Sequence, residues 1–207
     1  MLKNIIYFGV SIILFFAGVI VYGIILNIRE DTLAEAMDKK GIEDLGDVYL
    51  LIDKKNFTIE LFSDSMLVKK YKAAFGNNSS PVKTSLDDNV TPTGNFIICN
   101  RDTAFLYHKL LQINYPNFNQ ISEFYKNNYI DRDEYKKLIA AVSEYDFLPE
   151  EGFKKQRIGI HGIGEYNLIF KNLPFAFNWT NGSIAVSNED IDELYTVTNI
   201  GTKVEIR

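Results

Sequence analysis

The first hydrophobic pattern in the chain is an unbroken apolar run over residues 5–26. No residue in it is charged, and it is long enough to cross a hydrocarbon core as a helix, which takes about 20 apolar residues. Lys3 precedes the run, and Arg29, Glu30 and Asp31 follow it. We therefore expect the amino terminus to stay in the cytoplasm and the rest of the chain to lie outside. A cleaved signal peptide is the alternative, although its apolar core is usually only roughly 7–15 residues long.

Apolar and polar positions alternate with period two from Asp47 onward, as in half-buried strands. Polar or Gly- and Asn-rich turns separate the alternating segments. The pattern predicts strands at 48–52, 57–62, 67–75, 96–100, 107–113, 157–160, 183–186 and 203–206.

Helical signals occupy three places between and beside these strands. Thr32 opens a capping-box pattern in the polar stretch after the apolar run. Between 119 and 144 the apolar residues recur at helical spacing, and Asp131 with Glu134 marks a helix start. Asn188 is placed to cap a last helix.

These patterns predict a mainly β domain with helical insertions, an α+β fold, preceded by one transmembrane helix. We expect an anchor (1–27), a polar linker (28–46) that could form a short helix, and a domain (47–207) with a helical insertion at about 119–144.

Composition excludes several classes of function. The chain has one cysteine and two histidines, His108 and His161, so an intrachain disulfide is impossible and a structural zinc site, which needs about four N or S ligands, is not expected. The net charge of −5 gives no basic footprint for nucleic acid. We expect no metal and no organic cofactor, and no pattern indicates an oligomeric state.

Four segments, in order, resemble the catalytic domain of the L,D-transpeptidases (the YkuD-like fold). The last is similar to a branch of the family with a W-T-x-G-C-I-A nucleophile segment, whereas the commonest form reads S-H-G-C-I-R. The four segments are the hairpin at 48–62, the TPTGNF turn at 91–96, Ile160-His161-Gly162, and NWTNGSIAVSN at 178–188.

The resemblance implies a β-sandwich fold and acyl transfer on peptidoglycan stem peptides at a bacterial cytoplasmic membrane. In the family a cysteine attacks the carbonyl carbon between an L- and a D-centre, D-alanine leaves, and an amine resolves the thioester. Water as the acceptor gives a carboxypeptidase. The implied partners are the stem peptides and, through the anchor, the membrane.

Residue roles carry over by position. His161 matches the general base, and the carbonyl of Gly162 matches the group that orients its ring. Backbone N–H groups around Gly182 and Ser183 match the oxyanion hole, which can contribute ~2.7–4 kcal/mol of transition-state stabilisation. The resemblance places substrate-binding residues at Trp179, Thr180 and Asn181.

Ser183 departs from the family, because it stands where the nucleophilic cysteine is expected. A hydroxyl needs a base to remove its proton during attack, whereas a thiol is already partly ionised at neutral pH. Three interpretations are open: an introduced Cys→Ser exchange, a natural serine variant with some activity, and an anchored pseudoenzyme. The pseudoenzyme would bind peptidoglycan or an envelope protein partner without turnover.

Overall fold

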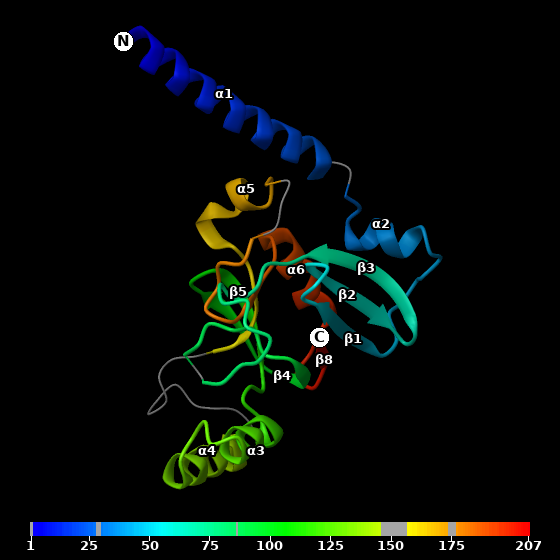
Figure 1. The fold of residues 1–207 in the computed structure, drawn as a ribbon. Helices are drawn as coiled ribbons and strands as arrows, with labels where there is room; N and C mark the ends of the chain where they lie inside the picture. The colour runs from blue at the N-terminus through cyan, green and yellow to red at the C-terminus, as the bar shows by residue number, and fades with distance from the viewer. Residues whose placement is uncertain (1, 28–29, 86, 146–156, 174–176) are drawn as a thin grey trace.

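The amino-terminal helix projects away from the body of the protein in the computed structural model and approaches it only near its carboxyl end (Figure 1). This helix, α1, runs over Leu2–Asn27, and almost all of its side chains are exposed. Leu2–Ile25 is a candidate span in which an 18-residue window has a mean hydropathy of 2.5, so the length and composition of the helix suit a membrane span. The structure describes residues 2–27, 30–85, 87–145, 157–173 and 177–207.

A single sheet of eight strands forms the centre of the domain, in the order β3-β2-β1-β8-β4-β5-β6-β7. β1 and β8 are parallel, as are β6 and β7, and the other neighbours are antiparallel. The strands are β1 (Val48–Asp53), β2 (Thr58–Ser63), β3 (Met66–Lys72), β4 (Gly94–Phe105), β5 (His108–Ile113), β6 (Gly159–His161), β7 (Ile184–Ala185) and β8 (Lys203–Ile206).

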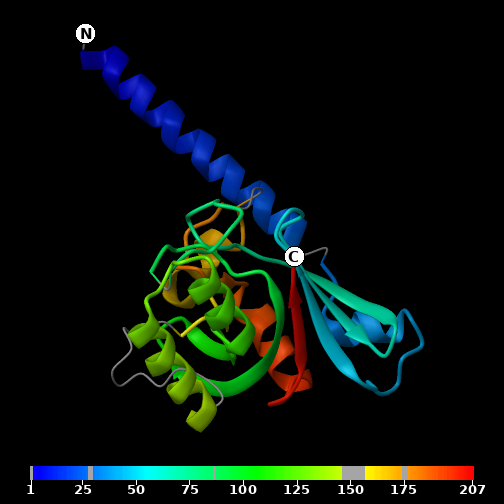
Figure 2. The same cartoon turned by 60° about the horizontal axis from the view of Figure 1, so that its bottom comes forward.

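The sheet bends at β4 and nearly closes on itself. The first part of β4 pairs with β8 and its second part with β5, with register shifts after Ile98 and Asp102. Figure 2 shows this strand curving around the body beside β8. Ala74, just beyond β3, forms an antiparallel bridge with Ala185 of β7, which joins the two ends of the strand order. The two halves therefore face each other across one core, which confirms the expected fold class.

Burial on the inner face follows the alternation in the sequence. Leu50, Ile52, Ile59 and Leu61 are fully buried from β1 and β2. At about 25 cal/mol per Å² of apolar surface, each such side chain contributes roughly 1.5–3 kcal/mol. The helix α6 (Asn188–Val197) covers this core with Ile191 and Leu194.

The predicted helical insertion forms a separate pair of helices, α3 (Phe118–Lys126) and α4 (Arg132–Tyr145). Figure 1 places the pair at the opposite end of the body from α1. Ile121, Leu138 and Val142 form its own small buried cluster. Asp131 caps α4 as predicted, because its Oδ1 accepts the N–H groups of Asp133 and Glu134.

The predicted short helix in the linker is present as α2 (Leu33–Asp38), and Thr32 and Glu35 complete the capping box. The prediction for Asn188 is wrong. Ser187 is the N-cap of α6, because its hydroxyl accepts the N–H of Asp190. Asn188 already lies in the first turn of the helix, and its side chain is used elsewhere.

Candidate active site

His161 ends β6, and its ring is buried in the domain with only 3% of the residue exposed. Its Nδ1 lies 2.6 Å from the carbonyl oxygen of Gly162. A carbonyl can only accept, so Nδ1 carries the proton and Nε2 holds the lone pair. Gly162 fits here because a Cβ would lie 2.6 Å from Asn188 Oδ1 and 2.7 Å from the carbonyl oxygen of Tyr107. The geometry therefore presents a neutral imidazole that can accept a proton at Nε2.

Among the residues that the structure describes, three aromatic rings surround the His161 imidazole. Tyr107 stacks on it at 5.2 Å between centroids, Phe105 lies at 5.7 Å, and Trp179 meets it edge-on at 5.9 Å. Burial lowers the pKa of His161 to about 4, and the hydrogen bond to Gly162 acts in the opposite direction. The imidazole is therefore neutral at physiological pH and a weak base.

Burial of a neutral histidine should make the stability of the domain depend on pH. Between pH 6.5 and about 4 the unfolded chain binds a proton at His161 that the folded protein does not. The free energy of unfolding should therefore fall as the pH drops through this window, by up to about 3 kcal/mol at 1.36 kcal/mol per pKa unit. Urea unfolding followed between about pH 7 and pH 4 measures this slope.

The matched control for this prediction is His161→Gln, which keeps every carboxylate that titrates in the same range. The variant should show a shallower fall in the free energy of unfolding than the parent. Parallel curves for the two proteins would show that His161 makes no contribution to the pH dependence.

Ser183 lies just before β7 and is 8% exposed. Its Oγ accepts the N–H of Gly159 at 3.3 Å and donates to the carbonyl oxygen of Arg157 at 3.3 Å. A hydroxyl has one proton to donate, so that proton is directed at the backbone. Within the described part of the chain, no hydrogen bond joins Ser183 to His161.

A tight turn carries the chain into Ser183. Thr180 Oγ1 donates to the carbonyl oxygen of Ser183 at 2.6 Å and accepts the N–H of Gly182 at 3.2 Å. Gly182 has φ of 105°, and a Cβ there would lie 2.9 Å from the carbonyl oxygen of Val90. Of the predicted substrate-binding residues, Thr180 is buried within this turn, Asn181 is exposed at its tip, and Trp179 is half-buried against His161.

The TPTG segment supports this turn from the other side. Gly76 donates its N–H to Thr91 Oγ1 at 2.8 Å, and the N–H of Asn77 donates to the carbonyl oxygen of Thr180 at 2.9 Å. The fold thus brings together three of the segments that the sequence singled out.

Asn188 joins two of these segments, a role that the sequence did not reveal. Its Oδ1 accepts the N–H groups of Ile163 and Gly164, both at 2.9 Å, and its Nδ2 donates to the carbonyl oxygen of Gly164. The loop after His161 is therefore fixed to the start of α6. Tyr107 and Phe105 were also missed, because their contact with His161 depends on how the β4–β5 hairpin folds over the ring.

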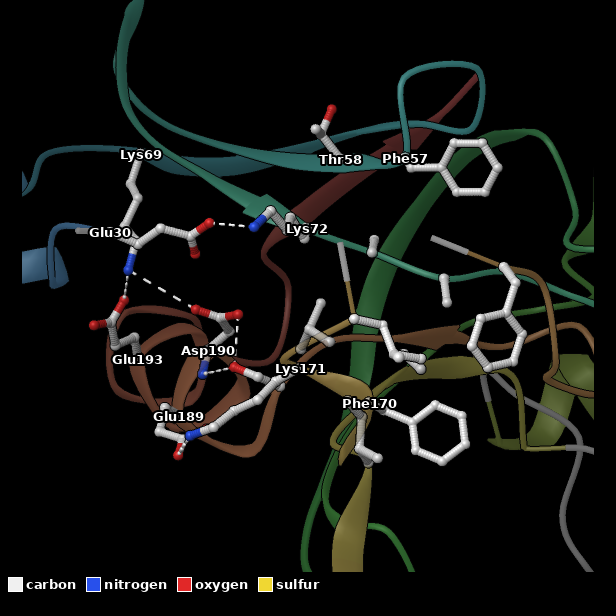
Figure 3. Close-up of a pocket in the computed structure, with 18 of the residues that line it drawn as sticks. Glu30, Phe57, Thr58, Lys69, Lys72, Phe170, Lys171, Glu189, Asp190 and Glu193 are labelled. Carbon is white, nitrogen blue, oxygen red and sulfur yellow. Dashed lines mark hydrogen bonds and ion pairs between the residues drawn. The ribbon is translucent and has the colours of Figure 1, made fainter. Parts of the chain in front are cut away.

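A cavity of about 630 Å³ lies beside the site and shares Trp179 with it. Neither His161 nor Ser183 lines this cavity. Figure 3 shows its charged side chains gathered between β3 and α6, with the rings of Phe57 and Phe170 across from them. The cavity therefore has one charged side and one apolar side.

The charges in this cavity are arranged in pairs. Lys69 contacts Glu193 at 2.5 Å and Asp190 at 3.9 Å. Lys72 pairs with Glu30 from the linker after α1, and Lys171 pairs with Glu189. Burial raises the pKa of Asp190, while its hydrogen bond to Ser187 and the nearby Lys69 oppose that shift. Across the described ranges, no group of three or more His, Cys, Asp or Glu residues could hold a metal ion.

Comparison with known proteins gives a family match over most of the chain. The family model of the L,D-transpeptidase catalytic domain matches residues 47–206. No curated protein matches the chain.

Solved structures similar to this chain are distant in sequence. An L,D-transpeptidase from Xylanimonas cellulosilytica is 15% identical, with a TM-score of 0.45 over 80% of this chain and 62% of that chain. A Bdellovibrio bacteriovorus protein, Bd1075, is 17% identical, with a TM-score of 0.48 over 79% and 48%. An L,D-transpeptidase from Mycobacterium smegmatis is 14% identical, with a TM-score of 0.43 over 78% and 59%. The chain covers less than two thirds of each of these structures.

Proposed function

Because the chain belongs to the L,D-transpeptidase catalytic domain family, we propose that it binds peptidoglycan stem peptides beside His161 and catalyses slow acyl transfer on them through Ser183. The observation that carries this proposal is the imidazole of His161, held as a proton acceptor by the Gly162 carbonyl oxygen at 2.6 Å. β6 and β7 pair in parallel, so His161 at the end of β6 and Ser183 immediately before β7 are carried by neighbouring strands.

The proposed reaction has two steps. Ser183 Oγ attacks the carbonyl carbon between the L- and D-centres while Nε2 of His161 takes its proton. The peptide C–N bond then breaks, the imidazolium returns the proton to the leaving D-alanine amine, and an ester remains on Ser183. An amine from a second stem, or water, then attacks the ester carbonyl carbon while Nε2 of His161 takes its proton. The ester C–O bond breaks, and the imidazolium returns the proton to Ser183 Oγ. The first acceptor gives a crosslink and the second gives carboxypeptidase cleavage.

Two features make this reaction slow. The Ser183 hydroxyl is engaged with the backbone at Arg157 and Gly159, so it must turn toward the ring before attack. The pKa of His161, about 4, makes the imidazole a poor base for a hydroxyl proton. General-base efficiency is best when the pKa of the base is near the working pH.

We propose that Trp179 and the adjoining cavity hold the stem peptide. The paired charges on one side of the cavity suit the amine and carboxylate groups of a diamino-acid stem, and the rings across from them suit its apolar parts. We further propose that α1 anchors the domain on the outer face of the cytoplasmic membrane, where such peptides occur.

A peptide titration tests this proposal, because Trp179 is the only tryptophan in the chain. A tetrapeptide stem ending in D-alanine should give a saturable change in tryptophan fluorescence. The same peptide with L-alanine at its end is the matched control and should bind at least about tenfold more weakly, a difference of ~1.4 kcal/mol. An unchanged spectrum with both peptides would contradict the proposal.

A second candidate function is binding without turnover, as an anchored pseudoenzyme that holds peptidoglycan or an envelope protein. The bonding of the Ser183 hydroxyl to two backbone groups favours this candidate. Both candidate functions predict that the tetrapeptide changes the tryptophan fluorescence. Only the acyl-transfer function predicts that a product forms.

A further inference from the structure

Large apolar side chains are exposed on one small part of the domain surface. The segment formed by η1 (Gly164–Tyr166) and α5 (Asn167–Phe170) exposes Tyr166, Leu168 and Ile169 by 61%, 67% and 50%. Leu106, in the β4–β5 turn, is 80% exposed. A Cβ on Gly164 would lie 3.4 Å from the carbonyl oxygen of Leu106, so the turn and the segment touch.

The end of α1 touches the same region. A Cβ on Gly23 would lie 1.5 Å from the carbonyl oxygen of Asn172, two residues past α5, so the two backbones are in direct contact. Gly23 is buried although the rest of the helix window is almost wholly exposed. Figure 1 shows α5 beneath the last turns of α1. Glycine is the residue that allows this approach, because any side chain would push the helix away.

The chain after α1 is short and fastened to the domain. Glu30 pairs with Lys72 at the end of β3, and the N–H of Leu33 donates to Glu193 Oε1 at 2.9 Å. From Asn27 to Glu30 the chain can span at most about 11 Å. The domain surface next to α1 must therefore lie close to wherever the helix leaves the bilayer.

The depth of the contact can be estimated from the length of the helix. The candidate span Leu2–Ile25, of 24 residues, is about 36 Å long at 1.5 Å per residue, against a hydrocarbon core of about 30 Å. Gly23 is four residues, about 6 Å, before the end of α1 at Asn27. Gly23 therefore lies at the outer boundary of the hydrocarbon core, next to the lipid headgroups.

We propose that Leu106, Tyr166, Leu168 and Ile169 form a bilayer-contact face that lies in the outer lipid headgroup layer beside the end of α1. Tyrosine and aliphatic side chains are suited to this layer, where an apolar face is buried by about 5–10 Å. The inference rests on α1 spanning the membrane, which is part of the proposed function. It adds that the domain meets the same membrane at a second place, which fixes its orientation there.

Site-specific labels on the full chain in vesicles test this inference. Cys99 is first replaced by alanine, and an environment-sensitive fluorophore is attached through Leu168→Cys. Ile200→Cys is the matched control, because Ile200 is equally exposed, at 66%, but follows the far end of α6. Phe15→Cys, in the middle of α1, reports the span itself. The vesicles contain phosphatidylcholine and phosphatidylglycerol, with nitroxide quenchers placed either at the headgroup or deep in the acyl chains.

The Leu168 label should shift its emission to the blue and lose most fluorescence to the headgroup quencher. The Ile200 label should keep the emission that it has in water, and the Phe15 label should be quenched by the deep nitroxide. A water-like Leu168 label with a deeply quenched Phe15 label would overturn the inference while leaving the anchor intact. A blue shift without lipid quenching would also overturn it, because a protein surface, such as a second copy, would then cover the face. A Phe15 label that is not quenched by the deep nitroxide would show that α1 does not span the bilayer, and the inference would then fail. The peptide titration would be unaffected by that result.

Discussion

Ser183→Cys should turn the slow acyl transfer that we propose for this protein into rapid release of D-alanine from tetrapeptide-containing muropeptides. The reason is the mismatch between nucleophile and base. An imidazole with a pKa of about 4 can hardly take a proton from a hydroxyl, but a thiol ionises near pH 8.5 and its thiolate is a strong nucleophile. Ser183 is buried in a turn built by Thr180 and Gly182, and sulfur adds little volume there. Incubation with purified muropeptides and chromatography of the products measures the gain.

Two further variants test whether product formed by Ser183→Cys comes from the proposed nucleophile and base. Ser183→Ala keeps the turn but has no nucleophile, so it should give no product at all. His161→Ala, made in the Ser183→Cys protein, should lose about 10²–10⁴-fold in rate, the usual contribution of general acid–base catalysis. If Ser183→Cys forms no product although the stem peptide still binds, the acyl-transfer proposal is wrong and the pseudoenzyme function stands.

Gly76→Ala should destabilise the domain strongly, although the change adds only one methyl group. Its Cβ would lie 2.0 Å from the carbonyl oxygen of Asn89 and 3.0 Å from Gly182 Cα, so backbone would have to move on both sides. Overpacking of this kind typically costs about 1–3 kcal/mol, and sometimes more. For a domain of this size we expect the Tm to fall by roughly 2–4 °C for each kcal/mol. Thermal unfolding followed by circular dichroism measures the loss.

The same substitution should also weaken binding of the stem peptide. The Gly76 N–H bonds to Thr91, and the next residue supports Thr180, so displacement there moves the turn before Ser183. Ser79→Ala, three residues away and exposed, is the control and should change stability by no more than about 0.5 kcal/mol. Equal melting temperatures for Gly76→Ala and Ser79→Ala would contradict the proposed packing.

The sequence predicted the helices whose formation depends on residues close together in the chain. The apolar run became α1, and the capping residues Thr32 and Asp131 start helices where expected. The second half of β4 was missed, because its polar residues Asn100 to Thr103 show no alternation. They are strand only because β5 folds back on them, and His108 opens β5 with φ of 82°.

The sequence predicted the site residues that lie within one motif. It did not predict the contacts between residues that are far apart in the chain and meet only in the folded domain. His161 and Gly162 are adjacent in the sequence, so the contact between ring and carbonyl followed from the motif. The aromatic rings around His161 come from distant strands and loops. The bridge between Ala74 and Ala185 depends on the bend at β4. The alternation of apolar and polar residues does not predict that bend. The sequence predicted Asn188 as a helix N-cap, whereas its side chain binds the loop after His161. Both roles use the same amide group, so the residue type alone does not distinguish them.

If α1 anchors the domain as proposed, the three peptide units from Asn27 to Glu30 set how far from the membrane the protein can work. A domain of about 160 residues has a radius of gyration of about 15 Å, and the connection adds at most about 11 Å. The site of a domain anchored in this way would therefore sample only a thin shell next to the bilayer, whatever the thickness of the wall beyond it. We expect it to meet newly inserted strands before mature ones, so that its position selects its substrate by age as well as by chemistry.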